Sequence, residues 1–168
     1  KTVYYVCKKK YGKDYATSTN TDIFQYDVAT DISKNITIGM MGYDVKPVLS
    51  PDEKFLAFTS MKTDGFEADK EDIILYHIQS GNKINLTKDW DGTVDNFIWS
   101  LDGKKIYFTA PTKGTRQVFE ISGLLSTPSI RQVTSGTFDI NDILAQEDPN
   151  ELICTRTDMN RASEIYSI

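Results

Sequence analysis

The sequence predicts an all-β fold, a partial β-propeller of about three and a half four-stranded antiparallel blades. The main observation is an internal repeat: a shift of the chain by 50 residues places DIFQYDV (22–28) on DIILYHI (72–78). The same shift, without a gap, places Asn35-Ile36-Thr37 on Asn85-Leu86-Thr87. Repeats of about 40–50 residues built from short strands are typical of propeller blades. No long helical periodicity competes with this interpretation.

Each repeat contains four short strand-like segments. The first ends at Leu49-Ser50 or Trp99-Ser100, and a turn follows; Asp102-Gly103 in one such turn is a strong hairpin signal. The second segment is found at 55–58, 106–109 and 152–155. The third carries an aromatic residue and an aliphatic residue two positions later, so that both lie on one face of a strand. These pairs are Tyr26/Val28, Tyr76/Ile78, Phe119/Ile121 and Tyr166/Ile168. The fourth segment ends at Ile36-Thr37, Leu86-Thr87 or Val133-Thr134.

We expect a single partial propeller domain over residues 1–168, with blade pieces at about 1–38, 39–88, 89–135 and 136–168. The first piece lacks its inner strand and the last lacks its outer strand, which gives three, four, four and three strands. A propeller protects its sheets by closing the ring. The open end blades therefore predict a missing remainder, aggregation or self-association.

Composition excludes several classes of partner. The chain has 168 residues and a net charge of −5, which argues against nucleic acid as a partner. No stretch approaches the roughly 20 apolar residues that span a bilayer. The two cysteines, Cys7 and Cys154, lie in apolar strand-like segments and are expected to be buried free thiols.

Catalytic motifs are missing from the sequence. There is no Gly-x-Ser-x-Gly elbow, and the only histidine, His77, lies in a strand and is interpreted as a structural or surface residue. No zinc-ligand spacing or glycine-rich phosphate loop is found. We therefore expect no catalytic residue, no metal site and no cofactor. The Asn-x-Thr motifs at 35–37 and 85–87 are interpreted as blade architecture rather than as glycosylation sites.

The loop at residues 61–71 is long and acidic and is the first candidate binding element. Its carboxylates Asp64, Glu67 and Asp69 could hold the ammonium of a peptide N-terminus through charge-assisted hydrogen bonds, with Glu67 or Asp69 favoured. The alternative is a solvated acidic loop with weak salt bridges to its own lysines. Calcium is a third possibility, although the loop lacks EF-hand spacing.

The loop at residues 88–92 is the second candidate, because it places Trp90 outside a strand. Trp90 could wall a ligand pocket or pack against a covering domain, and it could equally anchor the loop over the edge of a blade. Trp99, by contrast, is in strand register and is expected in the core.

Two segments resemble a known family. The repeat around Ser50-Pro51-Asp52 is similar to the repeats of periplasmic and peptidase propellers. The segments 64–70 (DGFEADK) and 86–91 (LTKDWD) resemble, more narrowly, the N-terminal propeller of the prolyl oligopeptidase family of serine peptidases, in particular its bacterial dipeptidyl-peptidase and acylaminoacyl-peptidase members.

The resemblance implies a parent protein that is a hydrolase, with its Ser-His-Asp triad on a C-terminal α/β-hydrolase domain outside this chain. The propeller would restrict access to small peptides and help to hold the free amine of a substrate, a role that falls on Glu67. The paired-glutamate pattern of one branch is missing, since the neighbours of Glu67 are Phe66 and Ala68. A periplasmic or secreted location is also implied.

An alternative function is a periplasmic Tol-like propeller scaffold that binds proteins and has no peptidase activity. A Gly-x-Ser-x-Gly elbow downstream of Ile168 would favour the peptidase. A complete propeller glycosidase is disfavoured, because the blades are too few and no inward acid pair can be assigned.

Overall fold

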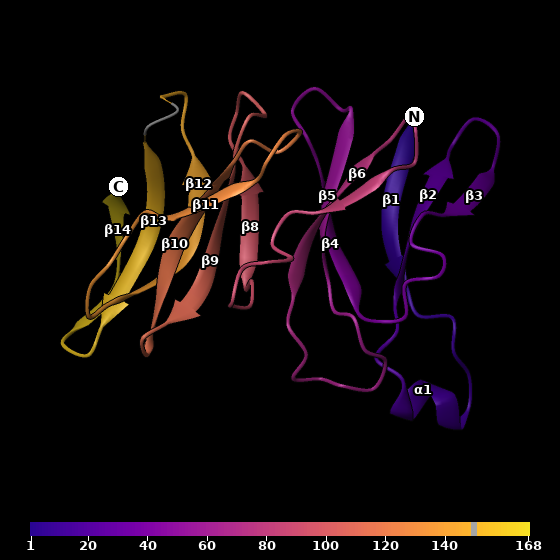
Figure 1. The fold of residues 1–168 in the computed structure, drawn as a ribbon, viewed down its shortest axis with the longest axis horizontal. Coiled ribbons are helices and arrows are strands. Elements are labelled where there is room, and N and C mark those ends of the chain that lie inside the picture. Colours follow the sequence, from indigo (N-terminus) through magenta and orange to yellow (C-terminus); the bar gives the residue numbers. More distant parts are fainter. Residues whose placement is uncertain (149–150) are drawn as a thin grey trace. The chain divides into compact units, whose positions relative to one another are not determined.

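The computed structural model describes residues 1–148 and 151–168 and confirms the all-β fold, with 50% of the residues in strands and 3% in helix. The strands form antiparallel sheets in which neighbours in the chain are neighbours in the sheet (Figure 1). The chain divides into two compact units, one of Lys1–Leu49 with Glu53–Asn85 and one of Ser50–Asp52 with Leu86–Ile168.

The first unit contains two sheets. The three-stranded sheet consists of β1 (Thr2–Cys7), β2 (Asp22–Asp27) and β3 (Ile32–Asn35). The four-stranded sheet consists of β4 (Asp44–Leu49), β5 (Phe55–Ser60), β6 (Asp72–His77) and β7 (Lys83–Asn85). A five-residue helix that the sequence did not predict, α1 (Lys13–Thr17), lies in the connection between β1 and β2.

The second unit also contains two sheets. The four-stranded sheet consists of β8 (Asn96–Trp99), β9 (Ile106–Thr112), β10 (Thr115–Ser122) and β11 (Ser129–Gln132). The three-stranded sheet consists of β12 (Asp139–Ala145), β13 (Leu152–Asp158) and β14 (Arg161–Ser167). In the described part of the chain, the expected succession of three, four, four and three strands is therefore confirmed.

Strand register confirms that the 50-residue repeat is structural. Phe24 on β2 pairs with Asn35, and Ile74 on β6 pairs with Asn85. Both partners of the second pair lie 50 residues after those of the first. Equivalent sequence positions thus occupy equivalent places in successive sheets, as expected of propeller blades.

The third strands show one correction to the sequence interpretation. Phe58 pairs with Ile74, whereas Phe108 pairs with Phe119. Phe119 is therefore the structural counterpart of Ile74, and not of Tyr76 two residues further on. The same holds for Tyr166, which pairs with Cys154. Side chains two residues apart lie on the same face of a strand, so a pattern of aromatic and aliphatic residues cannot detect this shift.

The core of the first unit is an apolar layer between its two sheets. Its buried members include Phe58 of β5 and Ile23 of β2, and Tyr4 of β1 and Met40 pack against them. The complete buried set is Ile23, Ile36, Leu56, Phe58, Ile74 and Tyr76. The matching hydrophobic faces of the two sheets account for their packing.

The second unit has an equivalent core. Its buried set is Tyr107, Val118, Ile140, Ile143, Leu152 and Cys154. Trp99 is buried as expected. Cys154 is a buried free thiol, whereas Cys7 is free but only half-buried, because it ends β1 at the edge of its sheet.

The threonine that ends each repeat closes the blade. The Thr37 hydroxyl accepts a hydrogen bond from the Ile23 amide at 3.0 Å, and the Thr134 hydroxyl accepts one from the Val118 amide at 2.9 Å. Thr37 and Thr87 are buried. These contacts support the interpretation of the Asn-x-Thr motifs as blade architecture.

His77 has a structural role, as expected. Its Nδ1 lies 2.7 Å from the Ser80 hydroxyl in the turn after β6, and its ring packs against Phe55 with the centroids 5.0 Å apart.

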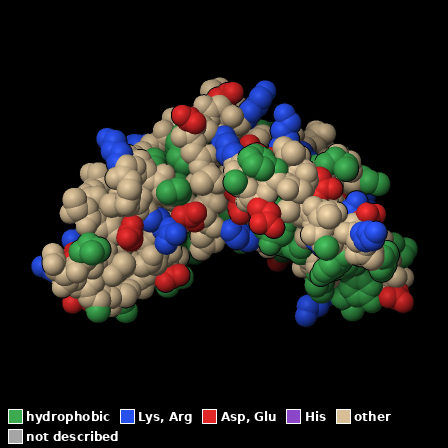
Figure 2. Space-filling model, turned by 90° about the horizontal axis from the view of Figure 1, so that it is seen from below, with side chains coloured by type: hydrophobic (Ala, Val, Ile, Leu, Met, Phe, Trp, Pro, Cys, Tyr) green, Lys and Arg blue, Asp and Glu red, His purple; other side chains and the backbone are tan. Residues whose placement is uncertain are grey.

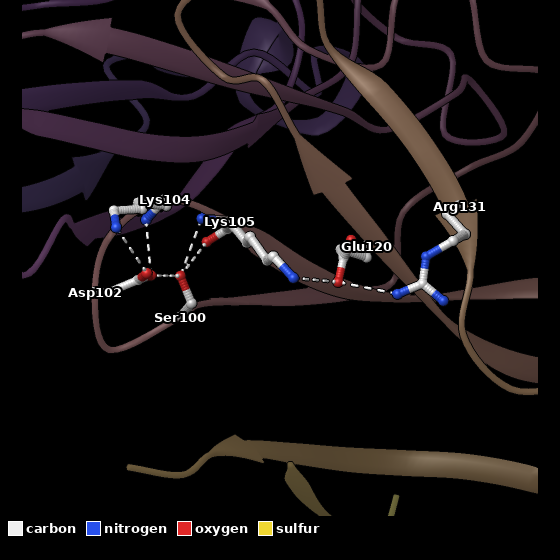
Figure 3. A network of polar contacts seen from close by, with 6 residues as sticks. All are labelled: Ser100, Asp102, Lys104, Lys105, Glu120 and Arg131. Carbon is white, nitrogen blue, oxygen red and sulfur yellow. Dashed lines mark hydrogen bonds and ion pairs between the residues drawn. The ribbon is translucent and has the colours of Figure 1, made fainter. Parts of the chain in front are cut away.

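A charged network joins β10 and β11 to the turn before β9 in the second unit (Figure 3). The carboxylate of Glu120 on β10 is nearly buried and accepts hydrogen bonds from Lys105 Nζ at 3.0 Å and Arg131 Nη2 at 3.2 Å. At the preceding turn, Asp102 accepts a hydrogen bond from the Ser100 hydroxyl at 2.7 Å. Two cations on one carboxylate compensate for its desolvation, so this arrangement is structural.

Apolar side chains remain exposed on the end sheet of each unit. Val3 of β1 and Ile32 of β3 are exposed in the first unit, and Leu144 of β12 and Ile165 of β14 in the second. Hydrophobic side chains also gather at the surface of the first unit on the right of Figure 2. Exposure of this kind was expected of blades without a neighbour.

Candidate functional site

The acidic loop at residues 61–71 connects β5 to β6, and Asp69 gives it its shape. One carboxylate oxygen of Asp69 accepts hydrogen bonds from the amides of Lys62 at 3.2 Å and Thr63 at 2.7 Å. The other oxygen accepts the Lys70 amide at 2.9 Å. Hydrogen bonds, first from the Thr63 side chain and then from the backbone, lower the pKa of Asp69. Asp69 is therefore ionised, and its hydrogen bonds hold the loop folded back on itself.

Asp64 joins this loop to the connection between β1 and β2. Its Oδ1 accepts hydrogen bonds from the Ser18 hydroxyl at 2.7 Å, the Thr19 amide at 2.8 Å and the Asn20 amide at 3.1 Å. The Gly65 amide donates to the Thr19 hydroxyl at 2.9 Å in return. The hydrogen bond from Ser18 is the main cause of the lowered pKa of Asp64.

Glu67 differs from the other three carboxylates of the loop, Asp64, Asp69 and Glu71, the last of which pairs with Lys46 Nζ at 3.4 Å. Glu67 is exposed, and among the residues that the structure describes it has no hydrogen-bond or ion-pair partner. It lines a cavity of about 350 Å³ in the first unit. The other lining residues are Lys8, Ala16, Ser18, Thr19, Thr21, Tyr43 and Met61. A carboxylate with free acceptor sites beside apolar side chains can bind an ammonium group that carries an apolar substituent.

The wall opposite Glu67 belongs to the β1–β2 connection and is ordered by Lys8. The Lys8 ammonium donates to the carbonyl oxygens of Tyr15 at 2.7 Å and Ser18 at 2.5 Å. It also lies 4.5 Å from the centroid of the Tyr15 ring. This side of the cavity is therefore held by the segment that contains α1.

The floor of the cavity depends on a close backbone approach at Gly42. The Thr21 amide donates to the Gly42 carbonyl at 3.2 Å, and the Met61 amide donates to the Tyr43 carbonyl at 3.1 Å. A Cβ atom on Gly42 would lie 1.8 Å from the Met61 carbonyl oxygen. Only glycine fits at this position.

A buried carboxylate, Asp44, lies at the start of β4, two residues after Gly42. Its Oδ1 accepts a hydrogen bond from the Ser60 hydroxyl at 2.6 Å, while its Oδ2 is buried without a hydrogen-bond partner. The Thr21 hydroxyl donates to the Asp44 carbonyl oxygen at 2.9 Å. Burial raises the pKa of Asp44 to about 6.

Trp90 belongs to the second unit, whereas the acidic loop at residues 61–71 belongs to the first. The Trp90 ring makes edge contacts with Phe108 and Phe119, with centroids 5.0 Å and 5.2 Å away, and packs over Gly92. Its amide donates to the Thr87 carbonyl at 3.0 Å, as the Met40 amide does to Thr37 at 2.9 Å one repeat earlier. These are the contacts of a loop anchor, and a contact of Trp90 with substrate stays a prediction.

Sequence reasoning did not identify Lys8, Tyr43 or Met61 as lining residues, nor Asp44 beside them. A signal existed for Gly42, because the 50-residue shift places it on Gly92. No such signal existed for Asp44, since the shift places it on Val94.

Two further features are absent from residues 1–148 and 151–168. No group of three or more His, Cys, Asp or Glu side chains is arranged to hold a metal ion there. No helix in that part of the chain has the length and apolar character needed to cross a membrane.

Comparison with known sequences gives relatives over the whole chain, although no protein-family model matches it. The chain is 34% identical to dipeptidyl-peptidase 5 of Porphyromonas gingivalis over 98% of its length. It is 36% identical to dipeptidyl-peptidase 5 of Porphyromonas endodontalis over its full length. The resemblance to the dipeptidyl peptidases of the prolyl oligopeptidase family is confirmed. The chain spans only 23% and 24% of these two relatives, so each of them is a much larger protein.

Solved structures confirm the propeller fold. The β-propeller domain of the Trilobed protease of Pyrococcus furiosus superposes with a TM-score of 0.64 and 15% identity, over 88% of this chain and 40% of that one. Acylaminoacyl peptidase of Pyrococcus horikoshii superposes with a TM-score of 0.68 and 18% identity, over 88% of this chain and 21% of that one. A TolB-type protein of Agrobacterium tumefaciens superposes with a TM-score of 0.64 and 18% identity, over 89% of this chain and 53% of that one. At these identities the likeness shows the fold alone, and it does not separate a peptidase from a binding scaffold.

Proposed function

We propose that this chain is the non-catalytic propeller segment of a serine exopeptidase of the dipeptidyl-peptidase type, in which it restricts access and orients the peptide. The observation that carries the proposal is the identity of 34–36% with dipeptidyl-peptidase 5 over 98–100% of the chain. A segment of this kind acts on binding and orientation rather than on bond cleavage.

Within the segment we assign the ammonium of the substrate to Glu67. Asp64 Oδ1 and both carboxylate oxygens of Asp69 accept hydrogen bonds from neighbouring residues, whereas Glu67 lines a cavity and its carboxylate has no partner among the described residues. An ion pair with hydrogen bonds between Glu67 and a free α-amine would place the N-terminal residue of the peptide in this cavity.

The substitution Glu67→Gln in the full-length protein is expected to lower kcat/KM for a free-amine dipeptide substrate by about 10- to 100-fold. This range corresponds to the loss of a charge-assisted hydrogen bond of about 1.5–3 kcal/mol. Because the contact would hold the substrate and not the reacting bond, most of the loss is expected in KM. The measurement is steady-state kinetics with a chromogenic dipeptide.

Two controls accompany this measurement. The substitution Glu53→Gln changes an exposed carboxylate in the turn before β5, at the end of the sheet opposite the cavity, and should leave the kinetics unchanged. An Nα-acylated substrate should be processed equally by the wild type and Glu67→Gln. Unchanged kinetics of Glu67→Gln with the free-amine substrate would remove Glu67 from the site.

The remainder of the proposed parent protein would supply the chemistry. We infer a C-terminal α/β-hydrolase domain with a Gly-x-Ser-x-Gly elbow, a periplasmic or secreted location, and small peptides as substrates. The support is the length of the relatives, of which this chain matches about a quarter. We also propose that the exposed apolar faces of the end sheets contact further blades of the same chain, with self-association as the alternative occupant.

A second candidate function is a Tol-like scaffold that binds proteins. The observation that favours it is the likeness in fold to the TolB-type protein of Agrobacterium tumefaciens. The full-length sequence separates the two: a nucleophile elbow downstream supports the peptidase, and its absence supports the scaffold.

A further inference from the structure

We propose that Asp64 is a positioning residue that fixes the Glu67 cavity by latching the β5–β6 loop onto the β1–β2 connection. The sequence alone offered Asp64 as a ligand of the substrate, and the structure points to a different task for its carboxylate. The role deepens the proposed function, on which only the kinetic part of the test depends.

The hydrogen bonds of the Asp64 side chain all run to the β1–β2 connection in the neighbouring blade. Its Oδ1 accepts three hydrogen bonds from the consecutive residues 18–20, one from a hydroxyl and two from backbone amides. The Ser18 hydroxyl that donates to Asp64 also accepts the Asn20 amide at 3.1 Å, so the donors of this segment are tied to one another. The latch joins residues more than 40 positions apart in the sequence.

The cavity takes its walls from the two segments that the latch joins. Lys8, Ala16, Ser18 and Thr19 belong to the β1–β2 connection. Met61 and Glu67 belong to the β5–β6 loop. The distance between these walls therefore depends on what ties the two segments together.

The other hydrogen-bonded carboxylates in the loop have different partners. Glu71 accepts a hydrogen bond from Lys46 of β4 at 3.4 Å. The hydrogen bonds of Asp69 run to Lys62, Thr63 and Lys70, all within the loop itself. Asp69 keeps the loop folded, and Asp64 keeps the folded loop in place. Glu67 lies three residues after Asp64 in the same loop, so its position relative to the opposite wall depends on the latch.

Hydrogen exchange of the full-length protein tests the latch directly. In Asp64→Ala, the amides of Thr19, Asn20 and Gly65 are expected to exchange at least about tenfold faster than in the wild type, because their acceptors are lost or displaced. A matched control is Asp102→Ala in the second unit, where a carboxylate accepts the Ser100 hydroxyl at 2.7 Å and the Lys104 amide at 3.0 Å in another turn. The control should leave the three amides unchanged. Unchanged exchange in Asp64→Ala would overturn the proposal.

Kinetics of a double mutant then test whether the latch acts through Glu67. Asp64→Ala is expected to raise KM for a free-amine dipeptide about tenfold with kcat unchanged. The double variant Asp64→Ala/Glu67→Gln should show a KM no higher than that of Glu67→Gln alone, because the two changes remove the same contact. A multiplicative increase would mean that Asp64 binds the substrate itself and would overturn the proposal.

The two readouts separate this inference from the proposed function. Faster exchange in Asp64→Ala together with normal kinetics of Glu67→Gln would support the latch and reject the amine site. A raised KM of Glu67→Gln together with unchanged KM in Asp64→Ala would support the amine site and reject the positioning role.

Discussion

Gly42→Ala is expected to destabilise the first unit by about 3 kcal/mol or more, the largest effect of any single methyl group that we predict. The added Cβ would lie 1.8 Å from the carbonyl oxygen and 2.4 Å from the carbonyl carbon of Met61. These are backbone atoms at the end of β5, and the Met61 amide is itself bonded to Tyr43. They cannot rotate away as a side chain would, so the strand or the loop must move. Denaturant unfolding of the purified protein measures the loss.

Gly92→Ala is the matched control for this substitution, because Gly92 occupies the same place one repeat later. There the added Cβ would meet the side chain of Trp90, at 2.5 Å, and not backbone. A side chain can shift at a lower cost, so a smaller loss is expected. Equal stability of Gly42→Ala and the wild type would show that the close approach at Met61 is wrong.

Asp44→Asn is expected to stabilise the protein at neutral pH by up to about 3 kcal/mol. Burial raises the pKa of Asp44 from 3.8 to about 6, so the folded state binds a proton between about pH 4 and pH 6 that the unfolded state has released. Stability therefore falls as the pH rises through this window and is level above it. A shift of about two units corresponds to about 3 kcal/mol.

The measurement is the free energy of unfolding from pH 4 to pH 8 for the wild type and Asp44→Asn. The amide is neutral throughout, so the variant should lack the part of the decline that is due to Asp44. The buried Oδ2 has no hydrogen-bond partner, so the loss of its acceptor capacity costs little, whereas the two donors of the amide nitrogen that replaces it offset part of the gain. Identical slopes in the two proteins would contradict the assignment of a raised pKa to Asp44.

The repeat explains why much of the fold could be predicted from the sequence. Equivalent residues of the first two blades lie 50 positions apart, and the pairs Phe24–Asn35 and Ile74–Asn85 reproduce this register. The two-residue shift at Phe119 was not predicted, because it leaves the buried face unchanged.

The candidate site was less predictable because it is built from loops that do not repeat. The 61–71 loop has no counterpart of its length in the next blade, where β9 and β10 are joined by a tight turn at Lys113-Gly114. The sequence showed that the loop was acidic, but it could not show which carboxylates would turn to Ser18, Thr19 and Asn20 and which would stay free. Such contacts between distant segments depend on the fold itself.

A crystal structure of the full-length protein with a free-amine dipeptide bound tests the central claim most directly. The account predicts that the ammonium of the peptide lies within about 3 Å of the Glu67 carboxylate, in the cavity between the β1–β2 connection and the β5–β6 loop. A peptide whose ammonium is held by another carboxylate, with Glu67 left in solvent, would contradict it.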